Sequence, residues 1–321
     1  SGIDADTSID RLDINQTGLS ALDFLSAGPS VRHLVIGGED LVDIGALASI
    51  AGLESLSVDR AYQLEDFSGL SSIEQLRSLF LSGVGQLDNL GFLEGLEGLT
   101  FFGLQHSRNV QDFSGLSYLT GADTIQLNWL GRLSLEPLSS LDNLLRLEVR
   151  GNQLTDLQSL ANLSKLEHLD VGDNAIVSLE ALSSLVSLRN LSFYDNRVEM
   201  IEPLSTLTLL ENLYAPNNRI RDLSPLRGLS ELSDVRLESN RIFRFVGIFD
   251  SNARFGSVYL DNNPILCSEI DEYNQDPAPI NLQFNTSCAS DSDADGVVDG
   301  EDQFPDDVSA SKDHDGDGKP D

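Results

Sequence analysis

The segment from Asp291 to Asp321 contains twelve acidic residues and two lysines, so its like charges repel one another strongly. A run of this density is usually a solvated, disordered tail. Here, however, Asp recurs at every second position and is followed by Gly296, which is the spacing and turn residue of a calcium-binding loop. Hard oxygen ligands at this spacing would bind Ca²⁺ and neutralise the repulsion. The predicted ligands of the first loop are Asp291, Asp293, Asp295, Val297 through its backbone carbonyl, Asp299 and Asp302.

A second, truncated loop follows in the same acidic segment. Its predicted ligands are Asp313, Asp315, Asp317 and Asp321. The first loop departs from an EF-hand, because Asp302 replaces the bidentate Glu and Gln-Phe-Pro follows where a helix would begin. The pattern D-x-D-x-D-G-x-x-D-x-x-D-x-F-P is similar to bacterial thrombospondin type 3 repeats. That resemblance implies Ca²⁺ ions in place of a hydrophobic core, and we expect the native protein to continue past this point.

An internal repeat of 22 or 23 residues precedes the acidic segment. The stretch LEHLDVGDNAIVSLEALSSL from Leu166 returns as LRNLSFYDNRVEMIEPLSTL from Leu188. We take the second leucine of each L-x-x-L-x-L as the register mark of its unit. The marks are Leu12, Leu34, Leu56, Leu79, Phe102, Ile125, Leu147, Leu169, Leu191, Leu213, Val235 and Val258. Twelve coils are therefore predicted.

Over residues 9–266 the chain resembles the leucine-rich repeat family, in particular its bacterial, internalin-like 22-residue class. The alternation L-x-L predicts a short strand with two buried side chains, and leucines three apart in D-L-x-x-L-x-x-L favour a 3₁₀ turn on the opposite side. One coil cannot bury its leucines alone, but stacked coils share one core. The resemblance implies an α/β solenoid, a right-handed horseshoe with its parallel sheet on the concave face and 3₁₀ or irregular turns on the convex face.

An asparagine stands five residues after the mark in the last six coils. We expect its amide to bond backbone groups that would otherwise be buried unpaired. These residues are Asn152, Asn174, Asn196, Asn218, Asn240 and Asn263, whereas the first six coils hold Thr17, Glu39, Ala61, Val84, Ser107 and Leu130. We interpret the difference as sequence drift in a tolerant scaffold in preference to a specialised site.

The two cysteines, Cys267 and Cys288, lie just beyond the last coil. Family members often close this end with a Cys-containing cap, so the resemblance implies a capping disulfide and an oxidising compartment. Two reduced thiols or half of a metal site are the alternatives, but the paired C-x-x-C spacing of zinc sites is missing. The predicted domains are the solenoid with its N-terminal cap (1–266), the C-terminal cap (267–288) and the calcium-binding repeat (289–321).

Charge and motifs exclude several functions. A formal net charge of −32 opposes binding to nucleic acid or to an anionic membrane, and no apolar run is long enough to span a bilayer. The start of the chain lacks Met and a signal sequence, so we expect a mature or excised piece. The four histidines are far apart in sequence, and no hydrolase, metalloprotease or phosphate-binding motif occurs. We therefore expect a protein that is not an enzyme.

Binding is predicted on the solvent side of the strands. Residues one before, one after and three after each mark should face solvent. In coils seven to twelve, the candidate ligand-binding residues at these positions are Arg146, Arg150, His168, Asp170, Tyr194, Tyr214, Arg236, Glu238 and Tyr259. Tyr and Arg are common in interface hot spots, although Tyr also suits half-exposed strands for structural reasons. Phe80 and Phe101 form a second, smaller apolar candidate.

The leading hypothesis is an extracellular bacterial surface module, adhesin-like or receptor-like, that binds a protein or a glycan and is carried on a calcium-stabilised stalk. A targeting or scaffold domain of a larger secreted enzyme is the alternative. A structural spacer is a third possibility, and it predicts a featureless polar face on the sheet.

Overall fold

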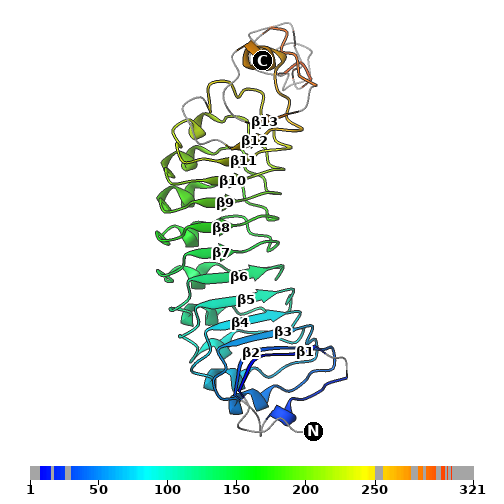
Figure 1. The fold of residues 1–321 in the computed structure, drawn as a ribbon. Coiled ribbons are helices and arrows are strands. Elements are labelled where there is room, and N and C mark those ends of the chain that lie inside the picture. Colours follow the sequence, from blue (N-terminus) through cyan, green and yellow to red (C-terminus); the bar gives the residue numbers. More distant parts are fainter. Residues whose placement is uncertain are drawn as a thin grey trace. The chain divides into compact units, whose positions relative to one another are not determined.

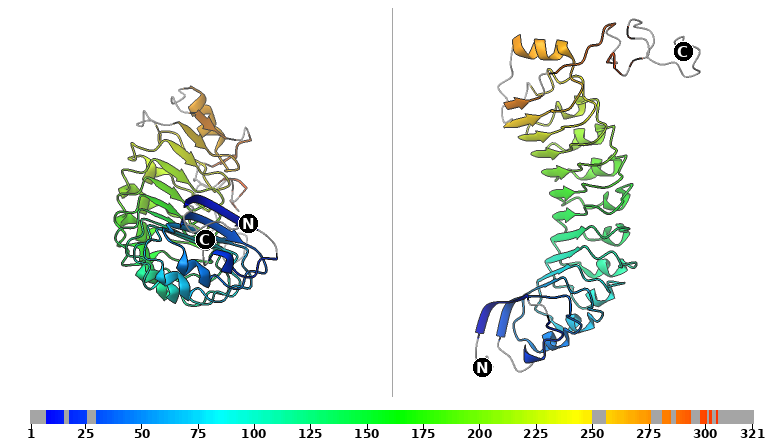
Figure 2. Two further views of the ribbon diagram at one scale, coloured as in Figure 1. Left: turned by 60° about the horizontal axis from the view of Figure 1, so that its bottom comes forward. Right: turned by 90° about the vertical axis from the view of Figure 1, so that its right-hand side faces the viewer.

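A computed structural model describes residues 8–15, 18–25, 30–249, 256–275, 281–284, 287–293, 298–300, 302 and 305. The chain divides into two compact units, Ser1–Ala175 and Ile176–Asp321. In each unit the strands lie on one side of the coils and the 3₁₀ turns on the other (Figures 1 and 2). None of the helices in the described ranges has the length and apolar character needed to cross a membrane.

Unit 1 alternates strands with 3₁₀ turns, and its strands pair in parallel in the order of the chain. The strands are β1 (Ser8–Asn15), β2 (Ser30–Gly37), β3 (Ser55–Asp59), β4 (Ser78–Ser82), β5 (Phe101–Gln105), β6 (Thr124–Asn128), β7 (Arg146–Glu148) and β8 (His168–Asp170). The turns are η1 (Asp23–Leu25), η2 (Gly45–Ser49), η3 (Ser68–Ser72), η4 (Gly91–Leu93), η5 (Ser114–Tyr118), η6 (Glu136–Leu138) and η7 (Gln158–Leu160).

Unit 2 repeats the same plan with short parallel strands. The strands are β9 (Asn190–Ser192), β10 (Asn212–Tyr214), β11 (Asp234–Arg236), β12 (Ser257–Tyr259) and β13 (Asn281–Gln283). The helical elements are η8 (Glu180–Ser184), η9 (Glu202–Thr206), η10 (Ser224–Leu226) and α1 (Cys267–Gln275).

The predicted register marks are confirmed by the strand pairing. Leu34 pairs with Leu56 and Leu56 with Leu79 in unit 1, and Leu213 pairs with Leu191 and Val235 in unit 2. These side chains are at most 2% exposed, apart from half-buried Leu12 at the start of the solenoid. The leucines of the 3₁₀ turns meet them in the same core. Because every coil contributes leucines at equal spacing, burial continues from coil to coil within each unit.

Each described coil from the second to the twelfth turns sharply at one place, four residues after the mark, where φ is positive. The residues there are Gly38, Arg60, Gly83, His106, Trp129, Gly151, Asp173, Asp195, Asn217, Ser239 and Asn262. Three are glycine, and the others adopt the left-handed conformation at a steric cost of about 1–2 kcal/mol each. Packing between coils therefore imposes this turn whatever residue occupies it.

The predicted structural role of the asparagines is confirmed. Asn218 Oδ1 accepts a hydrogen bond from Val198 N of the preceding coil (3.0 Å), and its Nδ2 donates to Phe193 O (2.9 Å). Asn240 makes the equivalent bonds to Ile220 N and Ala215 O, both at 3.0 Å. Each amide thus links its own turn to earlier coils and satisfies main-chain groups that are shielded from water.

The first six coils hold other residues at the asparagine position, five residues after the register mark. Ala61, Val84 and Leu130 are at most 1% exposed and fill the space with apolar atoms. Ser107 is fully buried, and its hydroxyl accepts the Val84 N–H of the preceding coil (3.3 Å). A shorter hydroxyl therefore replaces the amide in one coil, and hydrophobic packing replaces it in three others.

The end of unit 2 forms a cap that includes a strand which the repeat pattern did not predict. The predicted disulfide joins Cys267 to Cys288, and β13 pairs with β12 through Leu282 and Val258. Glu269 in α1 accepts the main-chain N–H groups of residues 245 and 246 (2.9 and 2.8 Å). Helix α1, β13 and the disulfide thus cover the last coil.

We predict that Asn218→Ala lowers the free energy of unfolding by roughly 1–3 kcal/mol, because Val198 N loses its partner without gaining water. Phe193 O loses one of its two donors and keeps Asn196 Nδ2. Urea denaturation followed by circular dichroism measures the change. Asn162→Ala is the matched control, since Asn162 is exposed and its loss should cost less than about 0.5 kcal/mol. Equal effects of the two substitutions would show that the buried amide has no special role.

Candidate functional site

The alternation of burial along the strands confirms which residues face solvent. In β8, β9 and β11 the central residue is buried while its two neighbours are partly exposed. All nine predicted ligand-binding residues lie on this solvent side of the sheet or directly after a strand. They form two groups, one in each unit.

In unit 2 the structure brings four of these residues into one continuous row. The rings of Tyr194 and Tyr214 meet edge to face with centroids 5.5 Å apart. The guanidinium of Arg236 lies 5.8 Å from the ring centroid of Tyr214 and 4.8 Å from that of Tyr259. We call Tyr194, Tyr214, Arg236 and Tyr259 the tyrosine–arginine row. Because its members hold one another through aromatic and cation–π contacts, its shape is fixed before any ligand arrives.

A shallow hollow of about 200 Å³ adjoins the row, between β10 and β11. Asp234 lines it and accepts a hydrogen bond from Arg236 Nε (3.4 Å). Asn212 lines it as well and donates to Asn190 Oδ1 (2.6 Å). Sequence reasoning missed Asp234 and Asn212, although both occupy the predicted solvent-facing position one residue before the mark.

Glu238 lies two residues after the arginine of the row. Its Oε2 is shielded from solvent and has no hydrogen-bond partner among the described residues. A buried carboxylate oxygen without a donor costs free energy. None of the described contacts offsets that cost at Glu238.

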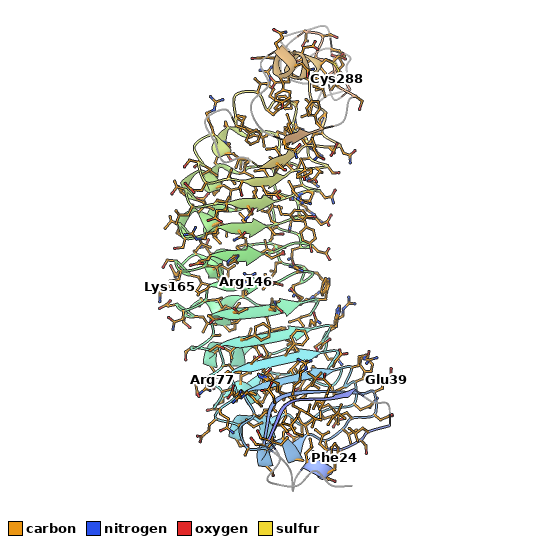
Figure 3. All side chains as sticks on the ribbon, viewed as in Figure 1. Phe24, Glu39, Arg77, Arg146, Lys165 and Cys288 are labelled. Atoms are coloured by element: carbon orange, nitrogen blue, oxygen red, sulfur yellow. A yellow bond between two sulfur atoms is a disulfide. The ribbon has the colours of Figure 1, made fainter. Side chains whose placement is uncertain are left out.

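In unit 1 the predicted residues are already engaged with one another. Arg150 contacts Asp170 through both Nε and Nη2 (2.8 Å each), and its Nη2 lies 3.4 Å from Glu148. Arg146 is exposed on β7 (Figure 3) beside His168 of β8. Because Arg150 and Asp170 largely neutralise each other, this group offers a ligand less charge than the sequence indicated.

The second predicted candidate, Phe80 with Phe101, forms an apolar patch on β4 and β5. Their ring centroids lie 6.4 Å apart. Gly103 is buried against both rings, since a Cβ at that position would lie 2.4 Å from Phe80 Cδ2 and 3.2 Å from Phe101 Cζ. Glycine therefore leaves the space that the two rings occupy, and close packing accounts for the patch.

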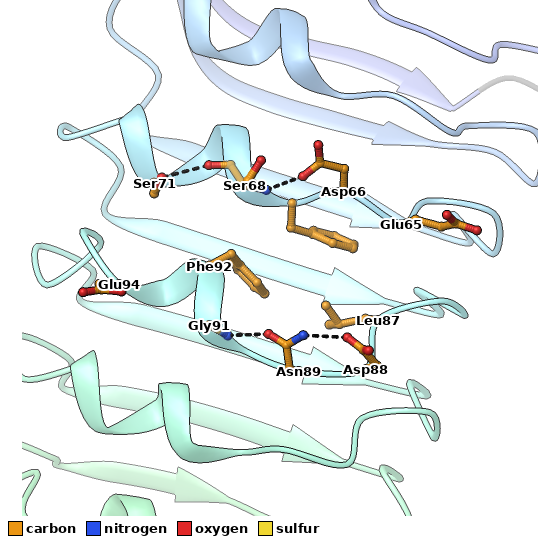
Figure 4. A pocket seen from close by; sticks show the side chains of 11 residues that line it. Glu65, Asp66, Ser68, Ser71, Leu87, Asp88, Asn89, Gly91, Phe92 and Glu94 are labelled. Carbon is orange, nitrogen blue, oxygen red and sulfur yellow. Dashed lines mark hydrogen bonds between the residues drawn. The ribbon is translucent and has the colours of Figure 1, made fainter.

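A hollow of about 540 Å³ lies between η3 and η4 in unit 1 (Figure 4). Phe67 and Phe92 meet in it with ring centroids 5.4 Å apart. Its polar groups serve the local fold: Asp66 Oδ1 accepts Ser68 N (2.8 Å), and Asn89 Oδ1 accepts Gly91 N (2.9 Å). These bonds fix the starts of the two 3₁₀ turns, so the hollow is a product of helix-start geometry.

The predicted calcium loops are described only in part. Asp299 accepts hydrogen bonds from Ser290 Oγ (2.5 Å) and Ser292 N (2.7 Å), which close the segment on itself. One carboxylate oxygen each of Asp291, Asp293 and Asp302 is shielded from solvent. The predicted ligands outside the described residues are Asp295, Val297, Asp313, Asp315, Asp317 and Asp321. Across the described ranges no three His, Cys, Asp or Glu side chains group closely enough to hold a metal ion, so the calcium site stays a prediction.

Parallel strands in register, 3₁₀ turns and an asparagine ladder define this protein as an α/β solenoid of leucine-rich repeats. A family model for leucine-rich repeats (two copies) matches residues 142–184. The solved structure of an internalin, inlF, from Listeria monocytogenes is similar over 84% of this chain and 84% of that chain, with 24% sequence identity and a TM-score of 0.68. At this identity the likeness establishes the fold.

Two other solved structures are similar to the chain. Internalin C2 from Listeria monocytogenes covers 86% of this chain and 80% of its own, with 21% identity and a TM-score of 0.37. The ectodomain of the Arabidopsis thaliana receptor kinase GASSHO1/SCHENGEN3, solved in complex with CASPARIAN STRIP INTEGRITY FACTOR 2, covers 80% of this chain and 36% of its own, with 17% identity and a TM-score of 0.58. No curated protein sequence matches the chain. The leucine-rich-repeat fold is typically a non-catalytic binding scaffold.

We predict that Asp66 titrates below its ordinary value of 3.8, because the hydroxyl and the main-chain N–H of Ser68 both lower the pKa of Asp66. Because the pKa of Asp66 is lower in the folded state than in the unfolded state, the ionised carboxylate stabilises the fold when the pH is above the ordinary pKa. This stabilisation is lost as the pH falls through the pKa of the folded state. Carbon-detected NMR titration should show the pKa of Asp66 rising in Ser68→Ala. Ser71→Ala, whose hydroxyl bonds Ser68 O, should leave it unchanged. The same Asp66 midpoint in all three proteins would contradict this cause.

Proposed function

We propose that this chain is the binding module of an extracellular bacterial surface protein, adhesin-like or receptor-like, and that it recognises a protein partner through the tyrosine–arginine row. The observation that carries the proposal is the continuity of the row. Four side chains from four successive coils touch in sequence on the solvent side of one sheet. A structural spacer has no use for such a surface.

The row has the chemistry of an interface hot spot. Tyrosine offers a large contact area with few rotatable bonds, and arginine adds directional donors, so little conformational entropy is lost on binding. Tyr214 is 40% exposed, and the side chain of Arg236 is 43% exposed. A partner could therefore cover both the apolar ring faces and the charged group.

The residues around the tyrosine–arginine row indicate which chemical groups a partner should carry. The hollow beside the row can receive one side chain, and Asp234 in its lining can accept a hydrogen bond. Asp234 partly neutralises Arg236, which weakens attraction to a simple anion. A protein segment with an apolar or aromatic side chain and a neighbouring N–H or cationic donor fits this combination best.

The fold and the cap are consistent with an extracellular setting. The plant receptor ectodomain with the same fold was solved in complex with another molecule, and the similar internalin supports a bacterial setting. The Cys267–Cys288 disulfide suits an oxidising compartment. The acidic segment would bind Ca²⁺ as a stalk, and support comes from its hard oxygen donors, three of which are withdrawn from solvent.

We predict that Tyr194→Ala combined with Tyr214→Ala weakens binding to the partner by about a hundredfold or more, since hot-spot residues each contribute about 2 kcal/mol. The partner is first isolated by pull-down with the full chain and then titrated by surface plasmon resonance. The melting temperature should change little, because both side chains lie on the surface of the sheet.

Tyr118→Ala is the matched control, since Tyr118 is 37% exposed on η5 in unit 1. Its binding should equal that of the unmodified chain. Undiminished binding by the double variant would place the site elsewhere on the protein. Loss of binding by the Tyr118→Ala control as well would show that the measured binding is non-specific.

The calcium stalk gives a separate prediction. A chelator should raise the rate of proteolysis after Cys288 and scarcely alter the main thermal transition, because the solenoid is stabilised by its leucine core and not by the ion. Limited proteolysis with mass analysis, beside a melting curve, measures both. If chelation melts the whole molecule, the ions are integral to the solenoid and the predicted domain division is wrong.

A further inference from the structure

Two neighbouring turns of unit 2 carry four arginines and no acidic residue, in a chain whose formal net charge is −32. The turns are residues 217–221 in coil ten and 239–244 in coil eleven. Their arginines are Arg219, Arg221, Arg241 and Arg244. We call these four residues the arginine surface. They come after the left-handed residues Asn217 and Ser239, so they belong to a different part of each coil from the tyrosine–arginine row.

The main chain holds the arginine surface in register. Arg219 N donates a hydrogen bond to Val198 O of the preceding coil (2.8 Å), and Arg241 N donates one to Ile220 O (2.9 Å). Ile220 and Ile242 are fully buried, so the residues on either side of each isoleucine point away from the core. Equivalent residues of neighbouring coils stand about 4.8 Å apart in such a ladder. Arg219 and Arg241 therefore form one column.

The positive charge of the arginine surface is only partly balanced. Arg219 Nη1 lies 3.6 Å from Oε1 of Glu199 in the preceding coil. Asp222 follows Arg221, and its two carboxylate oxygens accept hydrogen bonds from the main-chain N–H and the hydroxyl of Ser224 (2.8 and 2.7 Å). Four guanidinium groups against these two carboxylates leave a local surplus of two positive charges. Such a surplus in an acidic protein attracts anionic groups.

Two of the four guanidinium groups have no partner of their own. Those of Arg241 and Arg244 form no ion pair or hydrogen bond within the described part of the chain. Arg244 is exposed and Arg241 is partly exposed. Glu238 precedes them but lies on the solvent side of the sheet, where its Oε2 is shielded. Both arginines can therefore use their full set of donors, which suit the paired oxygens of a carboxylate.

An aromatic residue lies within the arginine surface. Phe243 is half-buried, and it holds the position in coil eleven that Arg221 holds in coil ten. Its main-chain oxygen accepts a hydrogen bond from Leu266 N of the next coil (3.0 Å), which fixes the backbone here. A ligand on this surface therefore meets an apolar group beside guanidinium groups. Polyphosphate and phosphate head groups have no apolar group to place against it.

We propose that the arginine surface binds a protein segment that is rich in Asp and Glu and carries an apolar side chain. The carboxylates pair with the guanidinium groups, as in other arginine clusters that recognise acidic motifs, and the apolar side chain covers Phe243. At an ionic strength of about 0.15 M, charges more than about 8 Å apart are largely screened, so the local surplus outweighs the net charge of the chain. This site does not rest on the protein-binding function of the tyrosine–arginine row.

The test measures binding of labelled peptides to the full chain by fluorescence anisotropy, at about 0.15 M salt. A chelator is present so that Ca²⁺ cannot bridge the peptide to the acidic segment of the chain. The probe is a peptide of Glu-Glu-Leu repeats, and its counterparts replace Glu by Gln or Leu by Ser. We expect the Gln peptide to bind at least about tenfold more weakly than the probe, because the charge-assisted pairs are lost. The Ser peptide should bind several-fold more weakly, because it leaves Phe243 uncovered.

Arg241→Ala combined with Arg244→Ala should weaken binding of the probe by about tenfold or more, since two charge-assisted pairs are removed. The melting temperature should change little, because neither guanidinium group contacts a described residue. Arg108→Ala is the matched control. Arg108 is exposed, holds the same coil position in coil five as Arg241 in coil eleven, and has an equally unpartnered guanidinium among the described residues. Its variant should bind the probe as the unmodified chain does.

Four outcomes would overturn the proposal. One is equal binding of the Glu and Gln peptides. Another is equal binding of the Leu and Ser peptides, which would contradict the contact with Phe243. The third is binding of the probe that the double arginine variant leaves intact. The fourth is tighter binding of a sulfated glycan such as heparin than of the probe, lost in the same variant, which would assign the surface to a polyanion that is not a protein.

Discussion

A coil of 22 or 23 residues cannot bury its own leucines or provide hydrogen-bond partners for its own main chain. Each coil therefore packs its leucines against a neighbouring coil and shares hydrogen bonds with it. Leucines at equal spacing supply a shared core, and burying each side chain contributes about 1.5–3 kcal/mol. The main chain is more demanding, because a shielded N–H without a partner costs about as much as a buried leucine gains. The asparagine amides of the last six coils meet this demand by reaching earlier coils.

The same constraint fixes the turn that follows each strand. A left-handed residue recurs at one position in coils two to twelve, on side chains as different as Trp129, Asp195 and Ser239. Local preference would place glycine there, so coil-to-coil packing overrides it. One result is that variable side chains are held at fixed spacing along the edge of the sheet. The stack of His106 on Trp129 arises in this way, with Gly151 providing the space beside it.

Because the inner positions serve the core, function is left to the solvent-facing ones. In unit 2 these positions form the tyrosine–arginine row, and in unit 1 they form an ion pair between Arg150 and Asp170 together with a phenylalanine patch. The two units therefore share a backbone plan but offer partners different chemistry. A repeated scaffold allows this, since side chains that point away from the core can change without disturbing the stacking.

The coils, the register marks, the 3₁₀ turns and the structural asparagines can all be predicted from the order of the residues, because regular spacing of leucines admits one way of burying them. The capping disulfide followed from family resemblance. The contacts along the row of Tyr194, Tyr214, Arg236 and Tyr259, and the ion pair of Arg150 with Asp170, became visible in the folded chain. The folded chain also revealed β13, whose sequence Asn-Leu-Gln carries too few apolar residues to show the repeat. Periodicity encodes which side of the chain is buried, whereas contacts between residues about 20 positions apart depend on rotamers and on the alignment of neighbouring coils.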